Sequence, residues 1–104
     1  MNKKVVLIVD DEPANINLVA EILHNLYEIR IATNGMTALS MIEKAKPDLI
    51  LLDINMPQMN GYEVAAKLKS SEETTNIPFI FLTAKSDAQS IVEGFKHGAV
   101  DYIS

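Results

Sequence analysis

Two short runs of apolar residues, each ending abruptly in acid, most constrain what this chain can fold into. The run at 49–52 (LILL) leads directly into Asp53, and the run at 5–9 (VVLIV) leads into Asp10 and Asp11. Neither run alternates with polar residues, so both faces of each strand should be buried, as in the centre of a parallel sheet. Functional groups in open α/β sheets gather where such strands end, at their carboxyl edge. The two runs therefore predict one acidic pocket shared by two buried strands.

Turn and helix signals divide the rest of the chain into alternating strands and helices. Pro13 suits the first turn of a helix, Thr33 or Asn34 can cap a second helix, and Asn60 with Glu63 resembles a capping box for a third. Strands are predicted over 5–9, 27–32, 49–53, 77–82 and 100–103, and a helix lies between each pair, the fourth over about 86–97.

Strict alternation of strand and helix predicts an α/β fold, with a parallel sheet, helices on both faces and right-handed crossovers. A length of 104 residues favours a single domain over 1–104, and a hydrophobic content of 48% is typical of an ordinary packed core.

Composition excludes several classes of function. The net charge is −5 and the basic residues are scattered, so the chain offers no concentrated basic face for nucleic acid. The absence of cysteine excludes disulfides and thiolate chemistry. No apolar run reaches membrane-spanning length, and the N-terminal run is too short for a secretory signal. We therefore expect a cytoplasmic protein that binds neither nucleic acid nor membrane.

Four segments, VLIVDDEP, LILLDINMPQMNG, FLTA and GAVDYIS, occur in an order and spacing that resemble the receiver domain of two-component response regulators. The resemblance covers the whole chain. It implies a flavodoxin-like, doubly wound parallel sheet of five strands in the order 2-1-3-4-5. It also implies a signalling switch, not a turnover enzyme, that receives a phosphoryl group from a histidine kinase or a phosphotransfer protein.

The resemblance implies a role for each acid of the predicted pocket. Asp53 is the expected phosphoacceptor and also a metal ligand, while Asp10 and Asp11 position Mg²⁺, with Asp11 the direct ligand of that pair and Asp10 acting through water. The backbone carbonyl of Asn55 is a further expected metal ligand. The residues themselves agree with a cation, because three converging carboxylates repel one another and Mg²⁺ prefers oxygen ligands. Glu12 is expected to be a first-turn helix acid and not a ligand.

Two further residues carry the switch in this resemblance. Thr83 corresponds to the hydroxyl that contacts a phosphoryl oxygen, and Tyr102 to the aromatic side chain whose rotation reports phosphorylation. Met56 and Met59 are expected to shape the loop and the surface beside the site.

The sequence departs from the family after the VDYIS segment, where a lysine, a proline and a fifth helix are expected but Ser104 is the last residue. We expect the missing lysine to impair phosphotransfer, with Lys85 exposed and not a substitute. We expect the missing helix to leave apolar surface that a homodimer or swapped oligomer would cover.

Two other functions remain open from the residues. The chain could be a non-catalytic interaction or dimerisation module that keeps only the fold. It could also be a magnesium-dependent phosphatase with Asp53 as the nucleophile, although such enzymes resemble D-x-D and have a second acid where this chain has Asn55.

Overall fold

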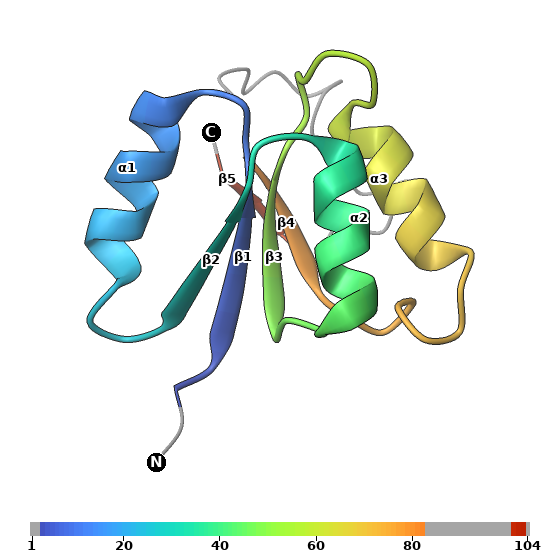
Figure 1. The fold of residues 1–104 in the computed structure, drawn as a ribbon, viewed down its shortest axis with the longest axis horizontal. Helices are drawn as coiled ribbons and strands as arrows, with labels where there is room; N and C mark the ends of the chain where they lie inside the picture. The colour runs from blue at the N-terminus through green and yellow to red at the C-terminus, as the bar shows by residue number, and fades with distance from the viewer. Residues whose placement is uncertain (1–2, 83–100, 104) are drawn as a thin grey trace.

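The computed structural model describes residues 3–82 and the backbone of 101–103. A parallel sheet of five strands has the order β2-β1-β3-β4-β5, which confirms the predicted order (Figure 1). The elements, in chain order, are β1 (Val5–Val9), α1 (Pro13–Leu23), β2 (Glu28–Ala32), α2 (Gly35–Lys44), β3 (Leu49–Asp53), α3 (Gly61–Lys69), β4 (Phe79–Leu82) and β5 (Asp101–Ile103).

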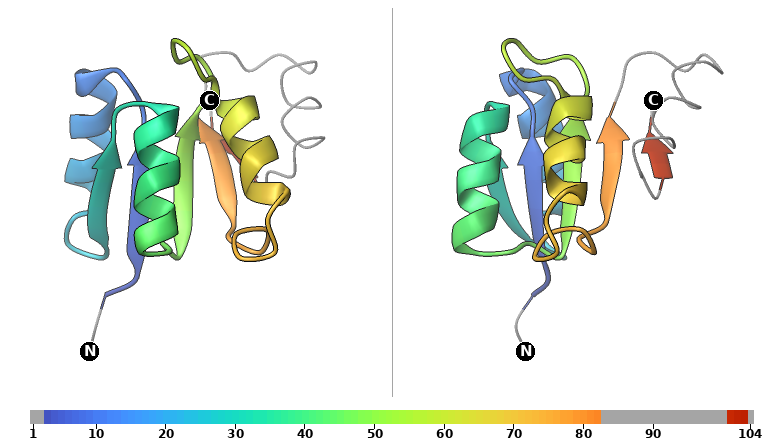
Figure 2. Two further views of the ribbon diagram at one scale, coloured as in Figure 1. Left: turned by 45° about the vertical axis from the view of Figure 1, so that its right-hand side comes forward. Right: turned by 90° about the vertical axis from the view of Figure 1, so that its right-hand side faces the viewer.

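Helices cover both faces of the sheet, with α1 on one face and α2 and α3 on the other (Figure 2). The alternation along β1 shows why its sequence is apolar throughout. Leu7 and Val9 join the core that packs against α2 and α3, whereas Val6 and Ile8 join the core beneath α1. All four side chains are buried. The prediction of central strands buried on both faces is therefore confirmed.

The predicted helix starts are also present. Helix α1 begins at Pro13. The missing N–H of proline costs no hydrogen bond there, because the first N–H groups of a helix have no partner within it. The Asn34 side chain caps α2 by accepting a hydrogen bond from the N–H of Thr37 at 2.8 Å. Asn60 and Glu63 form the reciprocal capping box that opens α3, at 2.9 and 3.1 Å.

Two strands start later than predicted because their first residues close turns. The N–H of Tyr27 donates to the carbonyl of Leu23 at 3.0 Å, so β2 begins one residue later. The N–H of Ile77 donates to the carbonyl of Thr74 at 3.1 Å, and Pro78 has no N–H to donate to a neighbouring strand. Strand β4 therefore begins two residues later than its apolar pattern suggests.

Some predictions fall on parts of the chain outside the described residues. These are the helix expected over 86–97, Thr83, Lys85 and the side chain of Tyr102. The single-domain organisation stays a prediction. Among the helices that the structure describes, none is both long enough and apolar enough to cross a membrane.

Candidate functional site

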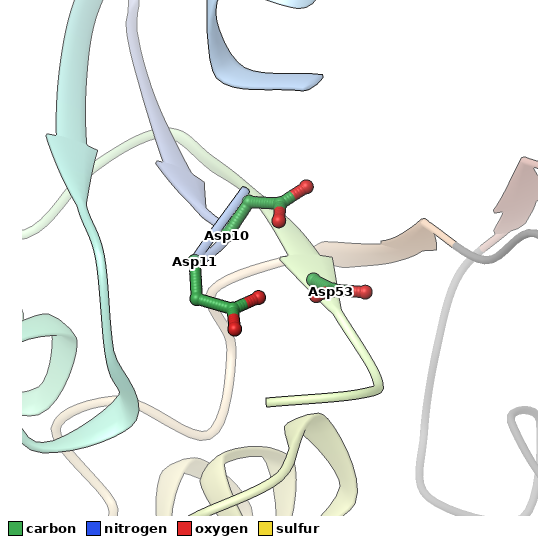
Figure 3. Close-up of side chains that lie close together, drawn as sticks. All are labelled: Asp10, Asp11 and Asp53. Carbon is green, nitrogen blue, oxygen red and sulfur yellow. The ribbon is translucent and has the colours of Figure 1, made fainter. Parts of the chain in front are cut away.

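The register of the two central strands brings Asp10 and Asp53 together. Val9 of β1 lies beside Leu52 of β3, so the residues that follow them, Asp10 and Asp53, are neighbours at the carboxyl edge of the sheet. Alternation along both strands also places these two side chains on the same face, the one covered by α1. Figure 3 shows the two carboxylates beside one another at the ends of their strands.

Asp11 completes a cluster of three carboxylates. One oxygen from each of Asp10, Asp11 and Asp53 can be chosen so that all three lie within 4.8 Å of one another (Figure 3). Burial is graded across the cluster: Asp10 is only 2% exposed, Asp53 is partly buried and Asp11 is exposed. The site is therefore open to solvent on the Asp11 side and closed behind Asp10.

Backbone N–H groups hold two of these carboxylates in place. Oδ1 of Asp10 accepts a hydrogen bond from the N–H of Glu12 at 2.9 Å, and the N–H of Asp10 donates to the carbonyl of Ala32 at 3.1 Å. Oδ1 of Asp53 accepts a longer hydrogen bond from the N–H of Asn55 at 3.3 Å. Each carboxylate is thus oriented by the turn that directly follows its strand.

The environment raises the pKa of Asp53 from 3.8 to about 7. Burial of the carboxylate is the largest cause, followed by the negative charge of Asp10. The hydrogen bond from the Asn55 N–H opposes this shift, while the charge of Asp11 and a hydrogen bond with the Asp10 side chain add to it. Without a cation, a substantial fraction of Asp53 is therefore protonated at neutral pH.

A comparison with known protein families identifies the family to which this fold belongs. Residues 6–104 match the model of the response regulator receiver domain family, which is nearly the whole chain.

This chain belongs to the response regulator receiver family.

Relatives of this receiver domain are found within longer proteins. It is 46% identical over 98 residues to a Vibrio cholerae protein named "Probable cyclic di-GMP phosphodiesterase", covering 94% of this chain and 22% of that protein. It also spans 22% of the response regulator PleD of Caulobacter vibrioides. The receiver domain therefore corresponds to about a fifth of these relatives, and their names describe the whole proteins.

Solved receiver structures have the same fold. The chemotaxis protein CheY4 of Vibrio cholerae aligns with a TM-score of 0.90 and 30% identity, covering 97% of this chain and 85% of that one. A Mn²⁺-bound form of the response regulator Rcp1 aligns with a TM-score of 0.88 and 29% identity, covering 97% and 80%.

Glu12 and Met56 of this receiver domain differ from their expected places. Glu12 is the N-cap residue of α1, one position before the first turn, and its side chain makes no capping hydrogen bond. Its carboxylate is not one of the three that form the cluster, and no ligand role was expected for it. Met56, expected to shape the loop surface, is 7% exposed and belongs to the core beneath α2 and α3. Ile54 and Met56 follow β3 and both side chains join this core, while Met59 is only partly buried.

The structure adds Gly61 to the residues that shape the site. Its N–H donates to the carbonyl of Ile54 at 2.9 Å, which closes the loop between β3 and α3 onto the residue after Asp53. The sequence suggested only a turn at Gly61, because a glycine after Pro57 and Asn60 is typical of any turn. No local pattern predicts which distant backbone such a glycine will touch.

The same loop contains a strained residue, Gln58, with a φ of 68°. The N–H of Met59 donates to the carbonyl of Pro57 at 2.7 Å, which makes Gln58 the central residue of a three-residue turn. Side chains with a Cβ rarely adopt this region, at a cost of roughly 1–3 kcal/mol.

We therefore expect Gln58→Gly to raise the free energy of unfolding by about 1 kcal/mol, since the relieved strain exceeds the added chain entropy of glycine. Urea unfolding monitored by circular dichroism measures this change. Gln58→Ala is the control, because alanine removes the polar side chain but keeps the Cβ that causes the strain. An equal gain from both substitutions would assign the effect to the side chain and contradict backbone strain.

Proposed function

We propose that this receiver domain is the phosphoacceptor switch of a two-component phosphorelay, in which Asp53 takes a phosphoryl group from a histidine kinase or a phosphotransfer protein. The observation that carries the proposal is the convergence of Asp10, Asp11 and Asp53 at the carboxyl edge of the sheet. Three like charges so close together are unfavourable unless a cation or a proton offsets them. Burial and the negative charge of Asp10 raise the pKa of Asp53, so its ionisation is unfavourable unless a cation offsets that charge.

The carboxylate oxygens fit Mg²⁺ as that cation. Mg²⁺ takes octahedral oxygen ligands at about 2.0–2.1 Å, so two ligands of one ion lie about 3–4 Å apart. Carboxylate oxygens within 4.8 Å of one another fit a single ion that some carboxylates bind directly and others through water. Asp11 is the proposed direct ligand of the acidic pair, Asp10 acts through water, and Asp53 and the Asn55 carbonyl are further ligands. The Mn²⁺-bound form of Rcp1 supports a divalent cation, since Mn²⁺ takes similar oxygen ligands.

Phosphoryl transfer requires Asp53 in its ionised form. A carboxylate oxygen of Asp53 attacks the phosphorus of a phosphorylated histidine, and an O–P bond forms as the N–P bond breaks and the imidazole nitrogen keeps the electron pair. Water later attacks the acyl phosphate, releases inorganic phosphate and restores the carboxylate. Bound Mg²⁺ would offset the charge of the cluster and of the incoming phosphoryl group.

The signalling half of the proposal rests on Thr83 and Tyr102, which lie outside the described side chains. The added phosphoryl charge would draw the Thr83 hydroxyl, and Tyr102 would turn into the space that this movement vacates. These roles, the cytoplasmic location and self-association as a homodimer or swapped oligomer stay predictions. A clean monomer at low micromolar concentration in analytical ultracentrifugation would contradict self-association.

Intact-mass spectrometry tests the proposed function directly. We expect the chain, incubated with Mg²⁺ and acetyl phosphate, to gain one phosphoryl group that hydroxylamine removes, because hydroxylamine cleaves acyl phosphates. A chelator in place of Mg²⁺ should prevent the adduct. Circular dichroism under both conditions shows that the chain remains folded.

The same assay separates the competing functions. Rapid steady release of inorganic phosphate without an accumulating adduct would indicate a phosphatase. A folded chain that binds Mg²⁺ but gains no adduct would indicate an interaction module and overturn the phosphoacceptor proposal.

A further inference from the structure

The first turn of α3 lies directly against the backbone of the proposed phosphoacceptor. A Cβ placed on Gly61 would overlap the carbonyl oxygen of Asp53 and would lie 2.9 Å from the Cα of Ile54. Ordinary van der Waals contact begins at 3.4 Å, so any side chain at this position must push the two backbones apart. Backbone atoms cannot rotate away as a flexible side chain can. The glycine therefore allows helix and strand end to meet without an intervening side chain.

Gly35 occupies the matching first position of α2 and meets a different kind of neighbour. A Cβ there would lie 2.9 Å from Cγ2 of Val64 and 3.0 Å from Cγ and Sδ of Met59. These are side-chain atoms, and a methionine can change its rotamers to make room. A substitution at Gly35 thus disturbs the packing of α2 against α3, whereas one at Gly61 displaces the backbone of Asp53.

The contact at Gly61 is fixed from both sides. On the helix side, the capping box of Asn60 and Glu63 holds the first turn of α3 in place. On the strand side, the Gly61 N–H donates to the Ile54 carbonyl at 2.9 Å. Asp53 is the residue before Ile54, so its backbone position is set by how closely α3 seats on the end of β3.

That backbone position decides where the metal ligands point. Oδ1 of Asp53 is oriented by the Asn55 N–H at 3.3 Å, a bond long enough to be lost after a small displacement. The Asn55 carbonyl, the other proposed ligand of this loop, belongs to the same short segment between β3 and α3. Mg²⁺ demands near-ideal octahedral geometry, so a displacement of this segment should weaken its binding.

We propose that Gly61 is a positioning residue for the metal and phosphoryl site: its missing side chain lets α3 seat on the Asp53–Ile54 peptide and so sets the direction of the Asp53 carboxylate. This inference rests on the proposed function of the cluster. It makes Gly61, which is not among the proposed ligands, a determinant of metal affinity.

Matched substitutions at the first turns of α3 and α2 test the inference. We expect Gly61→Ala to weaken Mg²⁺ binding by about 10-fold or more in calorimetry, the range seen for residues that orient metal ligands. Gly35→Ala should lower the melting temperature and weaken binding much less than Gly61→Ala, because its Cβ meets side chains and not the backbone of Asp53. Removal of the caps repeats the comparison without a steric clash: Asn60→Ala should weaken binding by about 3-fold, and Asn34→Ala should not.

Hydrogen exchange at the Asn55 amide, measured without metal, should be faster only in the α3 variants.

Each result decides the inference. Mg²⁺ binding as tight in Gly61→Ala as in the wild type, or an equal loss in the α2 and α3 variants, would overturn it. If Gly61→Ala does not fold, the cap pair Asn60→Ala and Asn34→Ala decides in its place. If the wild-type chain itself binds no Mg²⁺, the proposed metal site fails and exchange at the Asn55 amide alone decides whether Gly61 positions Asp53.

Discussion

Replacing Asp53 with asparagine is expected to abolish the phosphoryl adduct and, without metal at pH 8, to make the protein more stable. Asparagine has no anionic oxygen to attack phosphorus, so the loss of adduct should be complete. The gain in stability has a separate cause. Ionised Asp53 is unfavourable in the folded state because it is partly buried beside Asp10. A carboxylate whose ionisation destabilises the fold is a candidate functional residue, which agrees with the proposed role of Asp53 as phosphoacceptor.

The pH dependence of this gain follows from the pKa of Asp53, which is about 7 in the folded protein and ordinarily 3.8. Between these values the folded chain holds a proton that the unfolded chain has released, so wild-type stability falls as pH rises from about 4 to about 7. The full shift corresponds to about 4 kcal/mol at 1.36 kcal/mol per pH unit. Solvent screening of a partly exposed group reduces this, and we expect about 2 kcal/mol.

Urea unfolding in the presence of a chelator measures the prediction at pH 4.5 and pH 8. Asp53→Asn should match the wild type in free energy of unfolding at pH 4.5 and exceed it at pH 8. Asp48→Asn is the control, because Asp48 lies just before β3, at the opposite end of the strand from Asp53. Its Oδ2 accepts a hydrogen bond from the Val5 N–H at 2.7 Å. An equal gain at both pH values, or from both substitutions, would contradict the role of Asp53 ionisation.

Removal of the charge at Asp11 is expected to weaken Mg²⁺ binding by roughly 30-fold or more. A single negative charge about 4 Å from a divalent cation contributes roughly 2 kcal/mol even in water, and each 1.4 kcal/mol is tenfold in affinity. Asp11 is exposed, so Asp11→Asn should leave the fold intact and report on the ion alone.

Isothermal titration calorimetry of Mg²⁺ measures the loss, with Glu12→Gln as the matched control. Glu12 is the next residue, is also exposed and lies outside the cluster, so its substitution removes the same charge without removing a proposed ligand. We expect less than about a 3-fold change in affinity from Glu12→Gln, because exposed charges are screened. Equal losses of affinity in the two variants would mean that Mg²⁺ is attracted by the overall negative charge and does not bind at Asp11.

Mg²⁺ should also stabilise the wild-type chain against urea, by about 2.7 kcal/mol at a concentration 100 times the dissociation constant. Asp11→Asn should lose most of this gain at the same concentration. This measurement is independent of calorimetric heats and of any phosphodonor.

The elements of this receiver domain could be predicted where the responsible interactions are short in sequence. Asn34 caps the N–H of Thr37, and Asn60 exchanges hydrogen bonds with Glu63, so both helix starts depend on residues three positions apart. Prediction was less accurate at Ile77, where a hydrogen bond to Thr74 competes with strand pairing. An apolar pattern cannot show whether a backbone N–H will donate within a turn or to a neighbouring strand.

The sequence by itself determined that two buried strands end in acid and that helices alternate with strands, because apolar runs and caps act within a few residues. Only the tertiary structure decided that Val9 lies beside Leu52, and so that Asp10 meets Asp53. The pKa of Asp53 and the contact at Gly61 were likewise decided there. Register and burial arise between segments far apart in the chain, and the contact at Gly61 arises between the two ends of one loop; packing of the whole domain selects all three.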